Sequence, residues 1–168
     1  MTEPIQEIIM HSLHAAAGLY HRLVLLVGET GSGKTAVLRC VARELGVPVI
    51  NVNLELSAHL VEMTAKQRAL KLPGLLDQIT EEGRPTVVLD NLEILFDKSL
   101  KQDPLRLLQG ISRNRSVIAS WNGSAEEEKL TYAASGHPED RNYELIDTFT
   151  LLVRMDGTAT IASEKHRT

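Results

Sequence analysis

The chain has few of the features that mark secreted, disulfide-stabilised or membrane proteins. Cys40 is the only cysteine among its 168 residues, so no disulfide can form within the chain. No apolar run reaches the ~18 residues of a membrane span, and the N-terminus lacks the basic and apolar zones of a signal peptide. We therefore expect an intracellular, cytoplasmic protein that does not contact a membrane.

Aromatic residues and positive charge are also scarce. Aromatic side chains make up 4% of the sequence, which leaves the core to Leu, Val, Ile and Ala. The formal charge of -4 argues against a large DNA-binding surface on the isolated subunit, although an assembly could still carry a local basic patch. The length suits one domain that buries about 70% of its unfolded surface.

What the chain does contain is a complete phosphate-binding loop (P-loop) of the pattern G-x-x-x-x-G-K-[ST]. Glycines let the backbone turn with positive φ, so that successive N–H groups point at an anion. In such a loop the lysine supplies positive charge for the β- and γ-phosphates, and the last hydroxyl can bind Mg²⁺. We expect a nucleotide to be held by Gly28, Glu29, Thr30, Gly31, Ser32, Gly33, Lys34 and Thr35.

The segments on either side of the loop occur in the order that this mechanism needs. Residues 21–27 are a near-continuous apolar run that ends at Gly28, as expected of a strand buried on both faces. Residues 35–45 have helical periodicity, and Gly46 follows as a stop. A strand, a glycine-rich loop and a helix in this order favour nucleotide binding over a chance glycine-rich turn.

The remaining sequence alternates between predicted strands and predicted helices. Strands are predicted at 47–54, where Pro48 favours a sheet edge, and at 86–90, 116–122 and 149–153. Helices are predicted at 4–20, at 58–82 with a break near Pro73-Gly74 and Leu70 turned inward, and after Asp103, a good N-cap. Residues 124–146 are polar and are expected to be irregular.

This alternation predicts a single-domain α/β fold, a P-loop NTPase with a five-stranded, mostly parallel sheet flanked by helices. We expect residues 1–21 to form a helix that packs on the core, residues 22–157 to form the P-loop domain, and residues 158–168 to be a flexible tail. The carboxyl ends of parallel strands collect ligands, so the strand ends are where further site residues are sought.

A second nucleotide motif is predicted at Asp90, the last residue of a buried strand. There a carboxylate can hold Mg²⁺ through a water molecule, opposite the Thr35 hydroxyl. Many P-loop ATPases with an added strand place a glutamate directly after this aspartate, where it polarises the attacking water, but here the residue is Asn91. An amide cannot accept a proton near neutral pH, so we predict slow hydrolysis, or hydrolysis completed in an assembly. Glu93 is the nearest replacement, with an exposed or core-flanking role as the alternative.

Asn122, at the end of the fourth predicted strand, has two interpretations. It could contact the γ-phosphate or hold the attacking water, as a polar sensor residue does in ring ATPases. It could also belong to a turn, because Asn122-Gly123 is a strong turn dipeptide. The neighbouring Trp121 is expected to pack in the core rather than to stack on a base.

Three arginines are candidates for an arginine finger, which stabilises the charge of phosphoryl transfer and can come from a neighbouring subunit. Arg141 lies between the fourth and fifth predicted strands, the segment from which ring ATPases extend this residue. Arg113 and Arg115 precede the fourth strand and could equally cap the C-terminus of a helix. Each of the three could instead be a plain surface charge.

Six further blocks of the sequence are distinctive. They are Val52-Asn53-Leu54-Glu55-Leu56, Leu89-Asp90-Asn91-Leu92-Glu93-Ile94-Leu95-Phe96-Asp97, Gln102-Asp103-Pro104-Leu105-Arg106-Leu107-Leu108-Gln109, Ser112-Arg113-Asn114-Arg115, Trp121-Asn122-Gly123 and Gly136-His137-Pro138. With the P-loop and these blocks, the chain from Leu23 to about Tyr143 resembles the BrxF family, the small P-loop proteins of type III BREX phage-defence systems. The resemblance implies an ATP-binding accessory component of a bacterial restriction system with an AAA+-like core. Two departures from the broad AAA+ pattern are Asn91 and the short stretch after the fifth strand, from which we expect no C-terminal helical lid.

Three functions are compatible with these residues. The first is an ATP- and Mg²⁺-dependent switch that assembles into a homo-oligomer and engages other BREX components or DNA. The second is a small-molecule or nucleotide kinase, which is disfavoured because residues 124–145 hold only Arg141, whereas kinase lids are usually rich in arginine. The third is a binding module whose P-loop is structural or binds nucleotide without hydrolysis.

Overall fold

Five parallel strands form the centre of the protein. The computed structural model describes residues 4–80, 85–126, 129–132, 141–144 and 150–161. The parallel strands confirm the predicted α/β fold, and the Pro48 segment leads into an edge strand, as predicted. Their order across the sheet is β2 (Val49–Asn51), β3 (Thr86–Asp90), β4 (Ser116–Glu126), β1 (Leu23–Gly28) and β7 (Leu151–Arg154).

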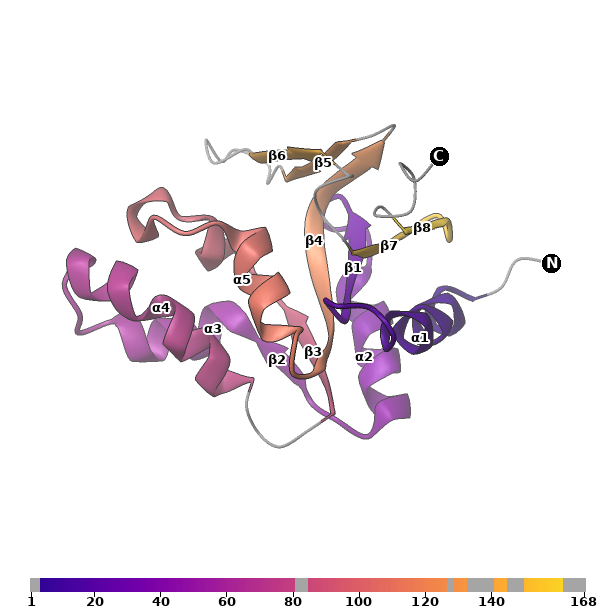
Figure 1. The fold of residues 1–168 in the computed structure, drawn as a ribbon, viewed down its shortest axis with the longest axis horizontal. Coiled ribbons are helices and arrows are strands. Elements are labelled where there is room, and N and C mark those ends of the chain that lie inside the picture. Colours follow the sequence, from indigo (N-terminus) through magenta and orange to yellow (C-terminus); the bar gives the residue numbers. More distant parts are fainter. Residues whose placement is uncertain (1–3, 81–84, 127–128, 133–140, 145–149, 162–168) are drawn as a thin grey trace.

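Helices cover both faces of this sheet (Figure 1). One face carries α1 (Ile5–Ala16) and α2 (Lys34–Leu45), and the other carries α3 (Val52–Leu60), α4 (Ala65–Ile79) and α5 (Pro104–Ile111). Alternate residues of β1 therefore enter different cores: Leu23 and Leu25 pack with the α3–α5 side, whereas Val24 and Leu26 pack with the α1–α2 side. This two-sided burial explains why the strand reads as a continuous apolar run. None of the described helices is long and apolar enough to cross a bilayer.

Helix α4 runs without a break through Pro73-Gly74, so the predicted interruption is wrong. Proline lacks the N–H that would bond to the carbonyl four residues earlier, which here is Ala69. Gln102 supplies the missing donor, because its Nε2 lies 2.8 Å from the Ala69 oxygen. Leu70 is 77% exposed, and its predicted inward orientation is also wrong, since Leu72 and Leu76 occupy the buried face.

Strand β2 is shorter than predicted. It ends at Asn51, and the expected strand residues Val52 to Leu54 belong to α3 instead. The cause is local, because the Asn51 side chain accepts a hydrogen bond from the Leu54 N–H at 3.0 Å and so caps the helix. Asp103 caps α5 in the same way, as the sequence predicts.

Three further strands extend the sheet from five strands to eight. β4 continues to Glu126 and pairs antiparallel with β5 (Lys129–Tyr132), which pairs with β6 (Arg141–Glu144). Residues 124–126, 129–132 and 141–144 thus form strands in the segment expected at 124–146 to be irregular, of which residues 127–128, 133–140 and 145–146 lie outside the described part. Trp121 is buried with its ring edge-on to Phe96 and Tyr132, which confirms that it packs in the core. β8 (Ala159–Ile161) pairs antiparallel with β7, so ordered structure continues into the segment expected to be a tail, of which residues 162–168 lie outside the described part.

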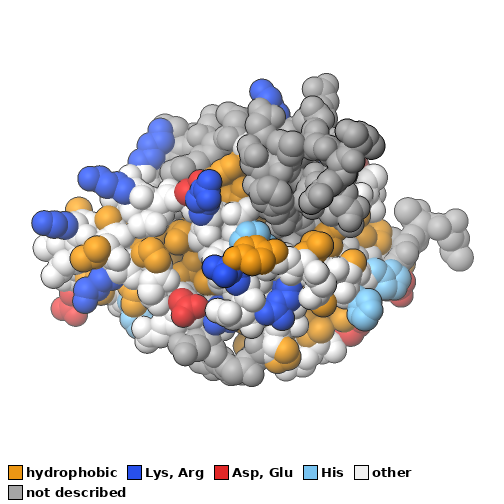
Figure 2. All heavy atoms as spheres, viewed as in Figure 1, with side chains coloured by type: hydrophobic (Ala, Val, Ile, Leu, Met, Phe, Trp, Pro, Cys, Tyr) orange, Lys and Arg blue, Asp and Glu red, His pale blue; other side chains and the backbone are white. Residues whose placement is uncertain are grey.

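The surface over α4 and α5 differs in charge from the chain as a whole. Figure 2 shows Lys and Arg side chains scattered over these helices and the turn into β4, with fewer Asp and Glu among them. Short 3₁₀ helices, η1 (Glu93–Phe96) and η2 (Lys98–Leu100), lie between β3 and α5. η2 packs against α4, so its lysine, Lys98, and the following Lys101 belong to the same surface.

Candidate functional site

The strand register brings the predicted site residues to one edge of the sheet. β1 pairs with β4 so that Gly28, the first P-loop residue, lies opposite Asn122. β3 pairs with β4 up to Leu89 and Ala119, which places Asp90 next to Ser120. All of these strands are parallel, so their carboxyl ends meet where ligands bind in open α/β sheets.

The P-loop connects β1 to α2 through conformations that require glycine. Gly31 and Gly33 have φ values of 82° and 100°, in the left-handed region. A Cβ on Gly28 would lie 2.6 Å from both Met155 Cγ and Ser32 Oγ, so no side chain fits there without displacement. Because α2 begins at Lys34, its N-terminal N–H groups and the positive end of its dipole lie at the loop.

Lys34 is buried at the loop although its side chain carries a charge. Its Nζ donates to the carbonyl oxygens of Gly28 and Glu29, at 2.8 and 2.7 Å. Burial lowers the pKa of Lys34, while the negative charges of Asp90, Glu93 and Glu29 oppose that shift. The ammonium is thus already held by oxygen atoms that phosphate oxygens could replace.

Both carboxylate oxygens of Asp90 accept hydrogen bonds. Oδ2 accepts from the Thr35 hydroxyl at 2.7 Å, and Oδ1 accepts from the Ser120 hydroxyl at 2.8 Å. Asp90 is 5% exposed, so these two bonds fix the carboxylate at the end of β3. Thr35 and Asp90, the predicted Mg²⁺ residues, are therefore adjacent, and their oxygen atoms are of the kind that Mg²⁺ prefers.

The backbone turns sharply just after Asp90. Asn91 has a φ of 55°, a left-handed conformation that asparagine tolerates better than glutamate does. The chain then enters η1, and the side chain of Glu93 at its start contacts Asn122 within β4. A glutamate is thus present near Asp90, but at position 93 and not at position 91, where many P-loop ATPases carry it.

Two amides hold the Glu93 carboxylate. Asn53 Nδ2 donates to Oε1 at 3.1 Å, and Asn122 Nδ2 donates to Oε2 at 3.4 Å. Asn53 is itself fixed, because its Oδ1 accepts from the Ile94 N–H at 2.7 Å and its N–H donates to the Asn91 carbonyl at 2.9 Å. Asn122 lies within β4, so its turn interpretation is wrong.

These side chains share one cavity, which we call the P-loop cavity, with a volume of about 340 Å³. Sequence reasoning did not find Ser120, nor Asn53, which holds Glu93 from outside the lining. In the sequence, the only local feature that marks Ser120 and Asn53 as site residues is that each is a polar residue near the end of a predicted strand. The lining residues are Thr30, Gly31, Gly33, Lys34, Thr35, Asp90, Asn91, Glu93, Ser120 and Asn122.

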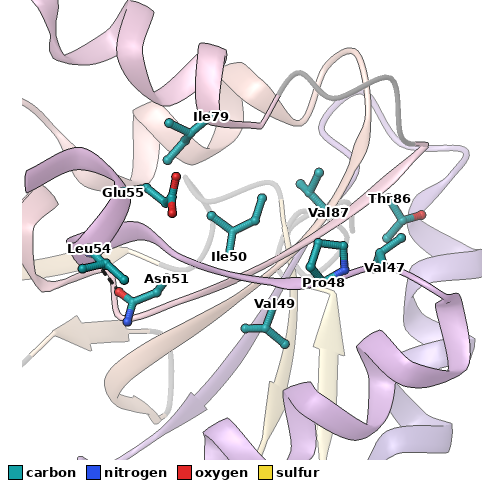
Figure 3. A pocket seen from close by; sticks show the side chains of 10 residues that line it. All are labelled: Val47, Pro48, Val49, Ile50, Asn51, Leu54, Glu55, Ile79, Thr86 and Val87. Carbon is teal, nitrogen blue, oxygen red and sulfur yellow. Dashed lines mark hydrogen bonds between the residues drawn. The ribbon is translucent and has the colours of Figure 1, made fainter. Parts of the chain in front are cut away.

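A second hollow of about 330 Å³ follows the edge strand β2 (Figure 3). Its walls are mostly apolar and include Pro48, Ile50, Ile79 and Val87, and Glu55 is the one charged residue among the described residues that line it. None of the predicted site residues lines it. The P-loop cavity is therefore the site in which charged and polar groups converge.

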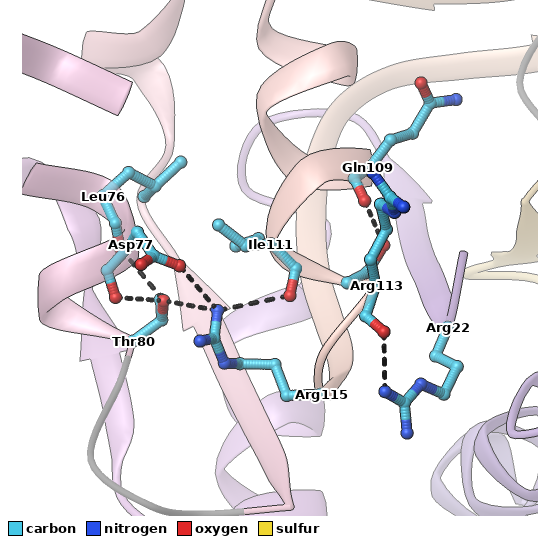
Figure 4. A network of polar contacts seen from close by, with 9 residues as sticks. Arg22, Leu76, Asp77, Thr80, Gln109, Ile111, Arg113 and Arg115 are labelled. Carbon is cyan, nitrogen blue, oxygen red and sulfur yellow. Dashed lines mark hydrogen bonds and ion pairs between the residues drawn. The ribbon is translucent and has the colours of Figure 1, made fainter. Parts of the chain in front are cut away.

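No arginine side chain of the described residues lines the P-loop cavity. Arg115 is bound within its own chain, because its Nη1 lies 3.2 Å from Asp77 Oδ1, Thr80 Oγ1 and the Ile111 oxygen (Figure 4). Arg113 is exposed at the opposite end of β4, with its guanidinium 4.8 Å from the Tyr20 ring centre. The backbone of Arg141 belongs to β6, but its side chain lies outside the described residues.

Part of the chain is similar in sequence to known ATP-dependent proteases. The chain is 35% identical over 107 residues to the ATP-dependent zinc metalloprotease FtsH of Syntrophus aciditrophicus, which covers 64% of the chain and 12% of that protein. It is 36% identical over 76 residues to FtsH 2 of Sorangium cellulosum, covering 45% and 12% of the two chains. The chain thus spans about an eighth of the length of these relatives.

Two solved structures overlap in part with the fold. C. elegans PCH-2 matches 73% of the chain and 37% of its own length, with 18% identity and a TM-score of 0.41. The replication initiator DnaA, in a structure bound to AMPPCP and single-stranded DNA, matches 69% and 36%, with 19% identity and a TM-score of 0.43. The model of the ATPase family associated with various cellular activities (AAA) matches residues 24–146, which is most of the chain. The chain therefore belongs to the AAA family.

Proposed function

We propose that this protein binds ATP with Mg²⁺ in the P-loop cavity and hydrolyses the nucleotide slowly. The observation that carries the proposal is the convergence of Lys34, Thr35, Asp90 and Glu93 on one cavity. Lys34 would bind the β- and γ-phosphates, and the Thr35 hydroxyl and Asp90 carboxylate would hold the metal, the latter through water. When bound, Mg²⁺ offsets the negative charge of the phosphates.

Glu93 is our candidate for the base that activates the attacking water. Within the part of the chain that the structure describes, it is the one carboxylate besides Asp90 that lines the cavity, and Asn53 and Asn122 position it. A carboxylate can accept the water's proton, whereas Asn91 can only orient the water. In this arrangement Asn122 both contacts Glu93 and lies beside the P-loop, where it can respond to the γ-phosphate.

Slow turnover is expected because the two amides fix the orientation of the Glu93 carboxylate. Each carboxylate oxygen has a second lone pair that can accept from water, but a water that lies away from this direction is reached only after one of the two contacts breaks. The cavity also lacks an arginine from the described part of the same chain. We therefore infer that a neighbouring subunit completes the site, with Arg141 or Arg113 as the arginine supplied in trans.

At the level of the cell, we propose that the protein is an accessory component of a BREX-type phage-restriction system. The support is the resemblance of the blocks around Asn53, Asp90 and Trp121 to the BrxF family, together with membership of the AAA family. Its partners would be further copies of the chain, assembled when ATP binds, and other BREX components.

The experiment has two arms. Mass photometry with and without ATP and Mg²⁺ should show larger particles only with nucleotide, and Lys34→Ala should remain small. In a host that carries the restriction system, Lys34→Ala should lose protection against phage. A particle size that ignores nucleotide, or full protection by Lys34→Ala, would contradict the proposal.

A second candidate is a nucleotide-dependent binding module that does not hydrolyse ATP. The specific observation in its favour is the same engagement of Glu93 by Asn53 and Asn122, which would persist if no partner releases it. Phosphate release measured at high protein concentration, with nucleotide bound, separates the two functions. The kinase alternative has no comparable support, because no arginine of the described residues lines the cavity to bind an acceptor.

A further inference from the structure

One surface of the protein is basic although the chain is acidic overall. We call it the basic face. It is formed by α4, η2, α5 and the turn before β4, and it lies in view in Figure 2. Its exposed side chains are Lys66, Lys71, Lys98, Lys101, Arg106 and Arg113.

The segment that forms the basic face is positively charged, whereas the rest of the sequence is negatively charged. Residues 63–115 carry nine Lys and Arg against seven Asp and Glu, a formal charge of +2, whereas the rest of the chain carries -6. Two of the seven acidic residues, Asp90 and Glu93, line the P-loop cavity and do not belong to this surface. The six Lys and Arg residues of the basic face are thus accompanied by three further described acidic residues of the segment, Asp77, Asp97 and Asp103.

These three carboxylates each have a partner within the protein. Asp97 accepts from the Ser99 N–H and hydroxyl at 2.9 and 2.7 Å. Asp103 caps α5 and also accepts from the Tyr143 hydroxyl at 2.8 Å. Asp77 pairs with Arg115. Asp103 also lies 3.8 Å from the Arg106 guanidinium. The three carboxylates thus stabilise turns and helix ends, whereas the side chains of Lys66, Lys71 and Lys101 are exposed.

Lys101 is exposed and has a strained backbone conformation. It follows η2 with a φ of 55°, a left-handed conformation that glycine adopts freely and that other residues adopt with strain. Its side chain is exposed, so packing does not account for lysine at this position. A ligand that needs a positive charge here would account for it.

We propose that the basic face binds the phosphate backbone of duplex DNA. Clustered Lys and Arg on one face neutralise phosphates and release counterions, which supplies affinity without reading sequence. Single-stranded nucleic acid would instead need aromatic side chains for base stacking. Phe96 is the only aromatic residue between Met63 and Arg115 and is 1% exposed. The nearby Tyr20 ring is exposed, and the Arg113 guanidinium lies over one of its faces.

This site is separate from the nucleotide site. None of the basic-face residues lines the P-loop cavity, so DNA binding could fail while nucleotide binding stands, and the reverse. An ATP-dependent assembly would align several basic faces and so strengthen the contact.

The test is the fluorescence anisotropy of a labelled random-sequence duplex of about 30 base pairs. Binding should weaken steeply between about 50 and 200 mM KCl, since each neutralised phosphate contributes about 0.9 to the slope of log K against log salt. The triple variant Lys66→Gln/Lys101→Gly/Arg106→Gln should lower that slope by about 2 to 3 and weaken binding roughly tenfold or more at the lowest salt. Lys101→Gly alone should fold at least as stably as the wild type, which separates loss of charge from loss of structure.

The matched control is Arg39→Gln/Arg43→Gln/Lys129→Gln, which removes the same charge from exposed positions on α2 and β5. It should bind the duplex nearly as the wild type does. The proposal is overturned if the wild type does not bind duplex at low salt with or without Mg-ATP, if the control loses as much affinity as the triple variant, or if a single strand of equal length binds more tightly.

Discussion

Replacing Glu93 with glutamine should uncouple ATP hydrolysis from ATP binding. The substitution keeps the length of the side chain and one acceptor oxygen but removes the group that can take a proton from water. Asn53 lies 3.1 Å from one carboxylate oxygen and Asn122 lies 3.4 Å from the other. Glutamine can keep the shorter contact with Asn53 and would turn its own amide toward Asn122, where two donors then meet.

The structure sets the size of each effect. Loss of one hydrogen bond to a charged group costs at most about 1.5 to 3 kcal/mol of stability, and the contact at 3.4 Å belongs at the lower end. Loss of a general base slows turnover about 10²- to 10⁴-fold, or about 3 to 5 kcal/mol in the activation barrier. Affinity for ATP should stay equal or rise, because a negative charge near the phosphates and Lys34 has been removed.

Two assays are needed on the same preparation. Single-turnover release of phosphate reports the chemical step, and titration with a fluorescent ATP analogue reports binding. Glu29→Gln is the matched control, because it also removes a negative charge that acts on Lys34. Glu29 belongs to the P-loop, but such a loop binds phosphate through its backbone N–H groups, which the substitution keeps, and the Glu29 side chain is exposed. The Glu29→Gln variant should hydrolyse ATP like the wild type.

Three results would refute this reasoning. The first is hydrolysis by Glu93→Gln within about threefold of the wild type, since loss of a base costs far more. The second is an equal loss in Glu29→Gln, which would indicate a general charge effect. The third is a parallel loss of ATP binding in Glu93→Gln, which would make Glu93 a structural residue.

Further predictions concern Lys34, Arg115 and Gly123. Since burial lowers the pKa of Lys34 below 10.5, ATP affinity should fall as pH rises through that lowered pKa, and a flat affinity profile would contradict this. The unfolded chain holds the Lys34 proton more tightly than the folded protein does. The free energy of unfolding without nucleotide should therefore rise over the same pH interval, relative to that of Lys34→Met. Arg115→Ala removes three contacts at 3.2 Å and should lower the free energy of unfolding by about 1 to 3 kcal/mol, while nucleotide affinity stays unchanged. Loss of ATPase activity without loss of thermal stability would instead identify Arg115 as the arginine finger. In Gly123→Ala the added Cβ would clash with the Thr131 carbonyl, so we expect the free energy of unfolding in denaturant to fall by about 2 kcal/mol or more. An unchanged free energy of unfolding would show that β5 does not pair with β4 as described.

Local sequence signals predicted the P-loop and the strand that ends at Asp90. Gly31 and Gly33 are needed by the loop itself, and the apolar run before Gly28 reflects two cores on either side of β1. Pro48 likewise indicated an edge strand from its missing donor alone. In each case the physical cause lies within a few residues of the signal.

The parts that the sequence did not predict depend on contacts between distant segments. Ser120 reaches Asp90 only because β3 and β4 pair in one register, and Glu93 reaches Asn122 only because Asn91 adopts a left-handed turn. Helix α4 continues past Pro73 because Gln102 replaces the missing donor from 33 residues away. Sequence periodicity carries no information about such partners.

The most direct test of the central claim is titration of the protein with a fluorescent ATP analogue in the presence of Mg²⁺, for the wild type and for Lys34→Ala. Lys34 is the one cation of the described residues that lines the P-loop cavity, and charge-assisted bonds to phosphate of the kind it would make are worth about 1.5 to 3 kcal/mol each. We predict saturable binding by the wild type and an affinity at least about tenfold weaker for Lys34→Ala, with its thermal stability retained. Absence of binding by the wild type, or equal affinity in the two proteins, would contradict the account.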